Sequence, residues 1–291
     1  MKEPRLVVVT ATADAKRFGE FAHELDFHAD GSVPIVAVAQ KFARWLPLRN
    51  GVIEGHNDYL GVVPAFARGC EIALRTYPRA EVIACLHDDL LVSEPDWDQK
   101  LLAHFDTHPD CGLAGFGGAW GLGDEQAGQG IYRPTWLVRR GFMSNMQDAE
   151  AHGTRVTEPR KIACLDGFSQ VFRRTFLQGR HHNGVGPNIA FDGTLFSILQ
   201  DWGVMHHAYD AATGAFARYL SWDTWLLPFA VHHKGGQTAV GDAQYNEWAR
   251  THAQKLPDST SVGDQVFWEQ AHKIIWQRLG HLLPFEVDRL G

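Results

Sequence analysis

The chain has 291 residues, of which 45% are hydrophobic and 21% charged, and its formal net charge is -7. This composition allows a sizeable core and excludes global disorder. The negative charge argues against a general binder of nucleic-acid phosphates, although a local basic groove built with Arg133, Arg139 and Arg140 is compatible with it.

The first 115 residues alternate between predicted strands and helices. Residues 5–10 form a β-branched run that predicts a strand, and residues 15–27 carry apolar side chains at helical spacing. The alternation continues with a loop or short strand over 46–57. The remaining strands and helices of this half are predicted over 33–39, 59–75, 82–86, 97–105 and 111–115. This order predicts an α/β fold with a mainly parallel, doubly wound sheet.

The pattern changes in the second half of the chain. Residues 117–130 are so rich in glycine that they predict a mobile loop rather than a helix or strand, and 132–160 show little periodicity. Residues 162–176 predict a strand, a tight turn at Asp166-Gly167, a second strand and the start of a helix. Further on we expect a helix, a strand and a helical tail over 191–203, 204–209 and 242–283.

Cysteine usage and hydropathy indicate where the protein works. The four cysteines form no C-x-x-C pair, which predicts buried free thiols in a reducing compartment. No apolar run approaches the roughly 18 residues of a membrane span, and the apolar stretch near the N-terminus is too short for a signal peptide. We therefore expect a cytoplasmic protein without a membrane span.

The most informative segment follows the strand predicted over 82–86. That apolar strand ends directly in His87-Asp88-Asp89. Two adjacent acids at the end of a buried strand are costly unless something positive meets them. Ligands of open α/β sheets collect outside the carboxyl ends of the strands, and a divalent cation carrying a phosphorylated ligand suits carboxylate oxygens. A turn or helix cap is the alternative role for the two acids.

The order of motifs resembles glycosyltransferases of the GT-A fold, and in particular the inverting family 2 group. The resemblance runs from residue 5 to about residue 233 and rests on four segments. The first segment is the first strand with its helix. The second is HNDYLGVVPAFARGCEIAL, in which Asn57, Gly61, Arg68 and Gly69 match the family pattern. The third is LHDDLLVSEPDW, and the fourth is LDGFSQVFRRTF followed by FDGTLFSILQDWG.

The resemblance implies a metal-dependent transferase that moves a sugar from a nucleotide sugar, UDP- or GDP-linked, to a hydroxyl acceptor with inversion. It divides the chain into a GT-A-like catalytic domain over 1–240 and a C-terminal helical extension over 241–291. Within the domain, 1–115 would bind the nucleotide and 116–240, with the Gly-rich loop 117–130, the acceptor. The tail helix would pack on the domain or form a homodimer. The acceptor stays open among a small molecule, a glycan, a protein and a modified nucleic-acid base.

For the metal, Mn²⁺ or Mg²⁺, the resemblance implies Asp89, with His87 in the first D-x-D position and His232 or His233 as a later ligand. Alternatively, His232 and His233 are ordinary residues of a turn at the end of a strand. In the nucleotide-sugar site it implies Asp88 at the ribose or metal, and Arg68 at the diphosphate or paired with an acid. Further candidates there are Thr10, Thr12, Asp14 and Glu54.

The catalytic base is expected to be Asp192, with Asp166 as the second candidate that more naturally orients the acceptor. Alternatively, Asp192 is the N-cap of a helix and Asp166 is an ordinary turn residue. The family's acid at the end of the second strand is missing, because that strand ends in Ala39-Gln40; Glu54 or Asp14 would have to replace it. The Gln-x-x-Arg-Trp motif of polymerising synthases is also missing.

Two other classes of function remain open at this stage. A nucleotidyltransferase would carry a Gly-rich loop after the first strand, and ATADAKRF lacks those glycines. A non-catalytic nucleotide- or sugar-binding module of the same fold would be compatible with the departures at His87 and Gln40.

Overall fold

The computed structural model describes residues 3–41, 48–123, 139–146, 153–186, 188–189, 193–234, 247–248, 264–283 and 285–287. An eight-stranded sheet forms its centre, in the order β10-β13-β6-β12-β4-β1-β2-β3. One half consists of β4 (Val82–Leu86), β1 (Leu6–Thr12), β2 (Ile35–Gln40) and β3 (Gly51–His56). The other half consists of β12 (Ser169–Arg173), β6 (Cys111–Gly115), β13 (Asp223–Leu226) and β10 (Arg160–Lys161).

The sheet is mainly parallel. The pairs β4-β1, β1-β2, β2-β3 and β6-β13 are parallel, whereas β12 runs antiparallel to both of its neighbours and β10 antiparallel to β13. Side chains of β1 and β4 alternate between two apolar cores, with Val7 and Ile83 in one and Val8 and Ala84 in the other. The predicted α/β fold, with a mainly parallel sheet and flanking helices, is confirmed.

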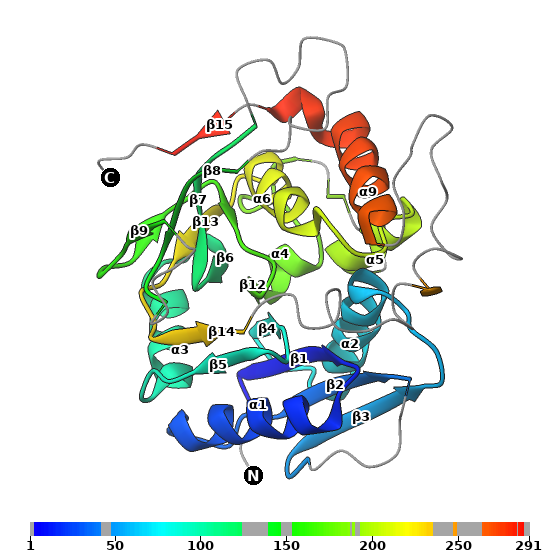
Figure 1. The fold of residues 1–291 in the computed structure, drawn as a ribbon. Coiled ribbons are helices and arrows are strands. Elements are labelled where there is room, and N and C mark those ends of the chain that lie inside the picture. Colours follow the sequence, from blue (N-terminus) through cyan, green and yellow to red (C-terminus); the bar gives the residue numbers. More distant parts are fainter. Residues whose placement is uncertain are drawn as a thin grey trace.

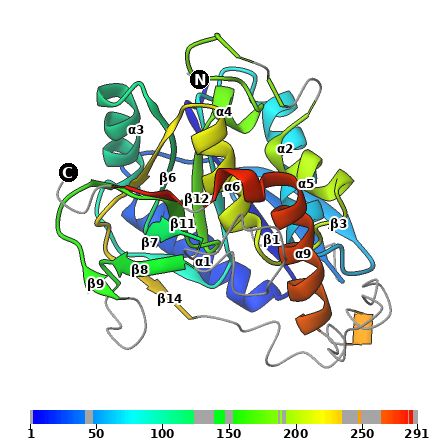
Figure 2. The same ribbon diagram turned by 90° about the horizontal axis from the view of Figure 1, so that it is seen from above.

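Helices cover both faces of this sheet (Figure 1). On one face, α1 (Ala15–His28) and α3 (Trp97–Thr107) bury Phe18, Phe21 and Trp97. The other face carries α2 (Val62–Thr76), α4 (Arg174–Leu177), α5 (Leu195–Asp201), α6 (Tyr209–Tyr219) and α9 (Asp264–Leu279), with the short 3-10 helix η2 (Gly280–Leu282) after it. Ala271, Ile275 and Leu279 join that core, so the tail helix packs on the rest of the chain beside α6 (Figure 2).

The Gly-rich segment differs from its prediction, because Gly117–Leu122 is a regular strand, β7. It joins β11 (Cys164–Leu165), β8 (Arg139–Ser144), β9 (Thr154–Arg155) and β15 (Phe285–Glu286) in a second sheet. A Cβ atom on Gly118 would lie 2.4 Å from the carbonyl oxygen of Cys164. Glycine is therefore used here for close approach between strands, not for flexibility. Residues 124–130 of the predicted loop lie outside the described residues.

Two further elements differ from the sequence-based expectation. The strand predicted over 204–209 is absent, and α6 begins at Tyr209 instead. The small side chains of the run Ala211-Ala212-Thr213-Gly214-Ala215 let α6 pack closely against β11. This packing prevails over the strand preference of the β-branched Val204. Helix α5 begins later than predicted, because Thr194 caps it and shares a capping box with Ser197.

Several other predicted strands are found at the expected places. The predicted strands over 5–10, 33–39, 82–86 and 111–115 correspond to β1, β2, β4 and β6, and the short strand around Val52 is β3. All four cysteines are buried and none forms a disulfide. Among the described residues, no helix is both long and apolar enough to cross a bilayer.

Candidate functional site

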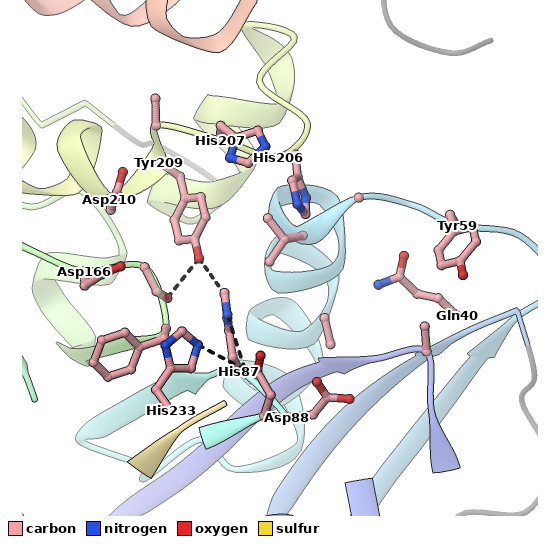
Figure 3. A pocket seen from close by; sticks show the side chains of 18 of the residues that line it. Gln40, Tyr59, His87, Asp88, Asp166, His206, His207, Tyr209, Asp210 and His233 are labelled. Carbon is pink, nitrogen blue, oxygen red and sulfur yellow. Dashed lines mark hydrogen bonds and ion pairs between the residues drawn. The ribbon is translucent and has the colours of Figure 1, made fainter. Parts of the chain in front are cut away.

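A cavity of about 300 Å³ opens where β1, β2 and β4 end (Figure 3). Its walls come from the residues that follow these strands, from the turn between β11 and β12, and from the start of α6. Open α/β sheets bind ligands at this edge. His87, Asp88 and Asp89 all line the cavity, so the segment singled out from the sequence does face an open space.

Three side chains converge on one side of this cavity. His87 and Asp89 follow β4, and His233 ends β14 (Val231–His233). Strand β14 runs antiparallel to β5 (Leu90–Val92), and their register sets His233 opposite Leu90, directly after Asp89. One ligand atom from each of His87, Asp89 and His233 lies within 4.8 Å of the others. We call these three residues the His-Asp-His cluster.

The cluster contains buried polar atoms without hydrogen-bond partners. Asp89 Oδ1 lies 3.2 Å from His233 Nε2 and 3.9 Å from His87 Nδ1. Neither Asp89 Oδ1 nor His233 Nε2 makes a hydrogen bond within the described part of the chain, although both atoms are buried. The two atoms face each other, so they form an ion pair when His233 Nε2 carries a proton, and a cation could take the place of that proton.

The hydrogen bonds of Tyr209 identify the free nitrogen of His87. The Tyr209 hydroxyl donates its single hydrogen to the Gly167 carbonyl oxygen at 2.9 Å. It therefore accepts from His87 Nε2, which lies 2.7 Å away, and the lone pair of neutral His87 is on Nδ1, toward Asp89. Burial lowers the pKa of His87, which favours this neutral form.

The cluster therefore presents two imidazoles and one carboxylate to a single point. Burial alone would raise the pKa of Asp89, but His233 and His87 beside it bring that pKa down to about 2, so the carboxylate is ionised. The Asp89 carboxylate also faces the lone pair of neutral His87 Nδ1, and a cation between these two atoms would be attracted to both. Nitrogen and oxygen donors of this kind suit a divalent transition metal, and His87, Asp89 and His233 fit it.

Of the two candidate histidines in β14, the structure brings His233 and not His232 into the cluster. Successive side chains on a strand point to opposite faces, and His232 pairs with Leu91 rather than with Leu90. His233 therefore takes the place of His232 in the predicted set of metal ligands.

Asp88 has different partners from those of its neighbour. Thr12 Oγ1 donates a hydrogen bond to Asp88 Oδ2 at 2.6 Å, and Arg17 Nε lies 2.9 Å from Asp88 Oδ1. Burial raises the pKa of Asp88 to about 6, against the opposing charge of Arg17. The side chain thus ties β4 to the end of β1 and to α1, while it also borders the cavity.

The other predicted nucleotide-binding residues do not line the cavity. Thr10 is buried in β1, and Asp14 caps α1 by accepting hydrogen bonds from the backbone of Lys16 and Arg17. Glu54 on β3 accepts a 2.6 Å hydrogen bond from Arg68 Nε, so these two satisfy each other. Thr10 and Thr12 point to one face of β1, and the alternating Ala11 and Ala13 reach the cavity instead.

The far side of the cavity holds a charged group of three residues. Arg139 Nη1 lies 2.8 Å from Asp210 Oδ2 and 3.3 Å from Asp166 Oδ1. Burial would lower the pKa of Arg139, but Asp210 and Asp166 raise it overall, so the guanidinium stays charged. Asp166 is thus where the sequence placed it, at the site. Asp192 lies outside the described residues, so its predicted role as the base stays a prediction.

Sequence reasoning missed several residues of the site. Tyr209 was predicted to end a strand, Asp210 was not singled out, and Arg139 was considered only as part of a local basic groove. A tyrosine and an aspartate just before the alanine-rich turns of α6 were the available signal, since an acid in the first turn favours a helix. His206 and His207, which were not among the predicted site residues, also line the cavity.

Comparison with known proteins shows distant structural similarity alone. No family model matches the sequence, and no curated protein matches it. The structure is similar to mannosyltransferase PcManGT from Pyrobaculum calidifontis in complex with GDP-Man and Mn²⁺, with a TM-score of 0.43 and 13% identity, over 96% of this chain and 71% of that one. It is also similar to A197 from STIV, with a TM-score of 0.40 and 11% identity, over 80% of this chain and 87% of that one.

Proposed function

We propose that the chain is a metal-dependent glycosyltransferase that moves a sugar from a nucleotide-sugar donor to a hydroxyl acceptor. The observation that carries this proposal is the His-Asp-His cluster, whose ligand atoms converge in a cavity at the carboxyl ends of parallel strands. A divalent cation held there would neutralise the charge of the departing nucleoside diphosphate. The sequence resemblance to GT-A glycosyltransferases points to the same class of reaction.

In this proposal the cavity has a donor end and an acceptor end on either side of the cluster. Asp166, Asp210 and Arg139 border one end, and carboxylates accept hydrogen bonds from hydroxyl groups, so we assign this end to the sugar and the acceptor. This assignment keeps the predicted division in which residues 116–240 serve the acceptor.

Among the described residues Asp166 is our proposed base, and Asp192, which lies outside them, remains the other candidate. Asp210 is held by the backbone of Ala211 and by Arg139, whereas the side chain of Asp166 makes only the longer contact with Arg139 within the described part of the chain. The acceptor oxygen bonds to the anomeric carbon as the bond from that carbon to the phosphate oxygen breaks. Asp166 takes the acceptor's proton, and the electron pair of the broken bond leaves with the nucleoside diphosphate. This single displacement inverts the anomeric carbon.

A thermal-shift titration tests the proposed donor class. We expect nucleoside diphosphates to raise the melting temperature in the presence of Mn²⁺ or Mg²⁺ and to have a much smaller effect with a chelator, because ligands that bind the folded state stabilise it by mass action. The nucleotide sugar that carries the preferred base should then be hydrolysed slowly, and its sugar should be transferred to an acceptor with inversion. Stabilisation by nucleotides that is independent of the cation would contradict the proposal.

A further inference from the structure

A second cavity lies away from the candidate site, between α1 and the residues that lead into β2 and β3, and we call it the α1 cavity. Its volume is about 190 Å³. An apolar cavity of about 150 Å³ already holds a benzene ring, so this space can accept an aromatic side chain. The apolar side chains that line it are those of Val8, Ala22, Leu25, Val33, Ile35 and Leu48.

Phe27 lies beside the α1 cavity but does not fill it. Its ring centroid is 6.0 Å from that of His23, which lines the cavity, and 71% of Phe27 is exposed. No other Phe, Tyr or Trp of the described chain is as exposed. Helix α1 lies on the outside of the molecule (Figure 1). Single exposed apolar side chains are common, but here an exposed ring and an apolar cavity of matching size stand next to each other.

The rim of the α1 cavity carries one acid and one base. Asp26 and Arg49 both line it, with 49% and 89% of their side chains exposed, and Arg49 Nη1 lies 3.5 Å from Asp26 Oδ2. This distance is longer than that of a charge-assisted hydrogen bond, so the two groups hold each other loosely. A rim with one charge of each sign is complementary to a copy of itself turned by a two-fold axis.

We infer that this face of α1 forms a two-fold symmetric homodimer in which Phe27 of each copy enters the α1 cavity of the other. Asp26 directly precedes Phe27, so it arrives at the rim of the other copy, where Arg49 lies. The buried ring supplies most of the affinity and the exposed charges fix the orientation. None of these residues lines the cavity at the ends of β1, β2 and β4, so the inference does not depend on the proposed function.

Sedimentation velocity over a concentration series up to about 500 µM measures the dimer dissociation constant. Phe27→Ser removes the exposed ring, and Ala22→Leu fills the α1 cavity from within. We expect each change to raise the dissociation constant by about tenfold or more, because each removes both symmetry-related contacts. Far-UV circular dichroism and thermal melting confirm that the two variants remain folded.

Val185→Ser is the matched control for the loss of an exposed apolar side chain. Val185 is 79% exposed, follows α4 and does not line the α1 cavity. We expect this variant to keep the dissociation constant of the wild type. A decrease in affinity equal to that of Phe27→Ser would show that the association is nonspecific, and would overturn the inference.

Exchange of the two rim charges tests whether the partner is a second copy. Asp26→Arg places only bases on both rims and should weaken the dimer, most clearly at low salt. The addition of Arg49→Asp restores one charge of each sign to each rim, and should restore association. A double variant as weak as Asp26→Arg alone would contradict the pairing between copies.

Three other results would overturn the inference. The first is a wild type that stays monomeric over the whole concentration series. The second is a Phe27→Ser protein that dimerises as tightly as the wild type, because the interface would then lie elsewhere. The third is a loss of affinity in Phe27→Ser together with unchanged affinity in Ala22→Leu, because the ring would then bind outside the α1 cavity.

Discussion

Asp88 and Asp89 are adjacent in sequence but meet different partners. Asp88 accepts from Thr12 and pairs with Arg17, and its pKa rises with burial to about 6. Asp89 lies between two imidazoles, and its pKa falls to about 2. The environment, not the residue type, therefore makes Asp89 the candidate cation ligand and Asp88 the link between β4, β1 and α1.

Tyr209 is a positioning residue in this account, because it touches His87 and not the cation. Tyr209→Phe removes the acceptor for His87 Nε2–H and lets the imidazole rotate or change tautomer. We expect Mn²⁺ affinity, measured by calorimetric titration of the folded protein, to fall by about 10- to 100-fold, as is usual when the partner of a metal-binding histidine is lost.

The matched control is Tyr77→Phe, which removes a partly buried hydroxyl far from the cluster and should leave Mn²⁺ affinity unchanged. Loss of the Tyr209 hydroxyl also leaves the Gly167 carbonyl without its partner, at a cost of about 1–3 kcal/mol in folding free energy. A Tyr209→Phe protein that binds Mn²⁺ as tightly as the wild type would show that the tautomer of His87 is set by something else.

Pairing between short elements decides which side chains reach the site. Strand β14 has three residues, and its antiparallel register with β5 alone selects His233 over His232. In the same way, the direction of β1 side chains selects Ala13 over Thr12 for the cavity. Strands buried on both faces carry apolar residues at every position, so the sequence does not show which face a given residue takes.

The packing of α3 on β13 gives the fold a pH-dependent element. His104 of α3 is buried against Trp225 of β13 and stacks on His108, with ring centroids 5.1 Å and 4.2 Å apart respectively. Its Nε2 has no hydrogen-bond partner in the described chain. Burial, and secondarily His108, lower the pKa of His104 from its usual 6.5 to about 4.

Between these two pKa values the unfolded chain binds a proton that the folded protein excludes. The contribution of His104 to stability is therefore complete above about pH 6.5 and is lost as the pH falls toward 4. We expect the fall in unfolding free energy between about pH 7 and pH 4.5 to be roughly 2 kcal/mol smaller in His104→Gln than in the wild type.

Chemical denaturation at the two pH values measures this difference, and comparison of variant with wild type cancels the other titrating groups. His23→Gln, an exposed histidine on α1, is the control and should follow the wild type. If His104→Gln loses as much stability as the wild type over this interval, His104 is not the group responsible.

Across the whole molecule, local signals could be predicted and long-range pairings could not. The strand-helix alternation and the acids after β4 lie in continuous stretches of sequence, so they were available. The cluster, by contrast, joins Asp89 to a histidine 144 positions later through the β5-β14 pairing, and Arg139 meets Asp210 through the packing of β8 beside α6. No short sequence pattern predicts contacts between residues that lie so far apart in the chain.

Glycine composition was the other source of error at this scale. The Gly-rich segment looked like a loop because glycine usually weakens strands. In β7 the missing side chains are needed, since Cys164 and Ile162 occupy the space that a Cβ on Gly118 would fill. The second sheet therefore could not be predicted from residue propensities, because its stability depends on contacts with residues far along the chain.

The most direct test of the account compares two neighbouring variants, His233→Ala and His232→Ala, by titration with Mn²⁺. The two changes remove the same side chain from consecutive positions of β14, so their effects on strand stability are closely matched. We predict that His233→Ala loses about tenfold or more of the wild-type Mn²⁺ affinity and that His232→Ala keeps it. Equal affinity in both variants, or loss in His232→Ala alone, would contradict a cation site made by His87, Asp89 and His233.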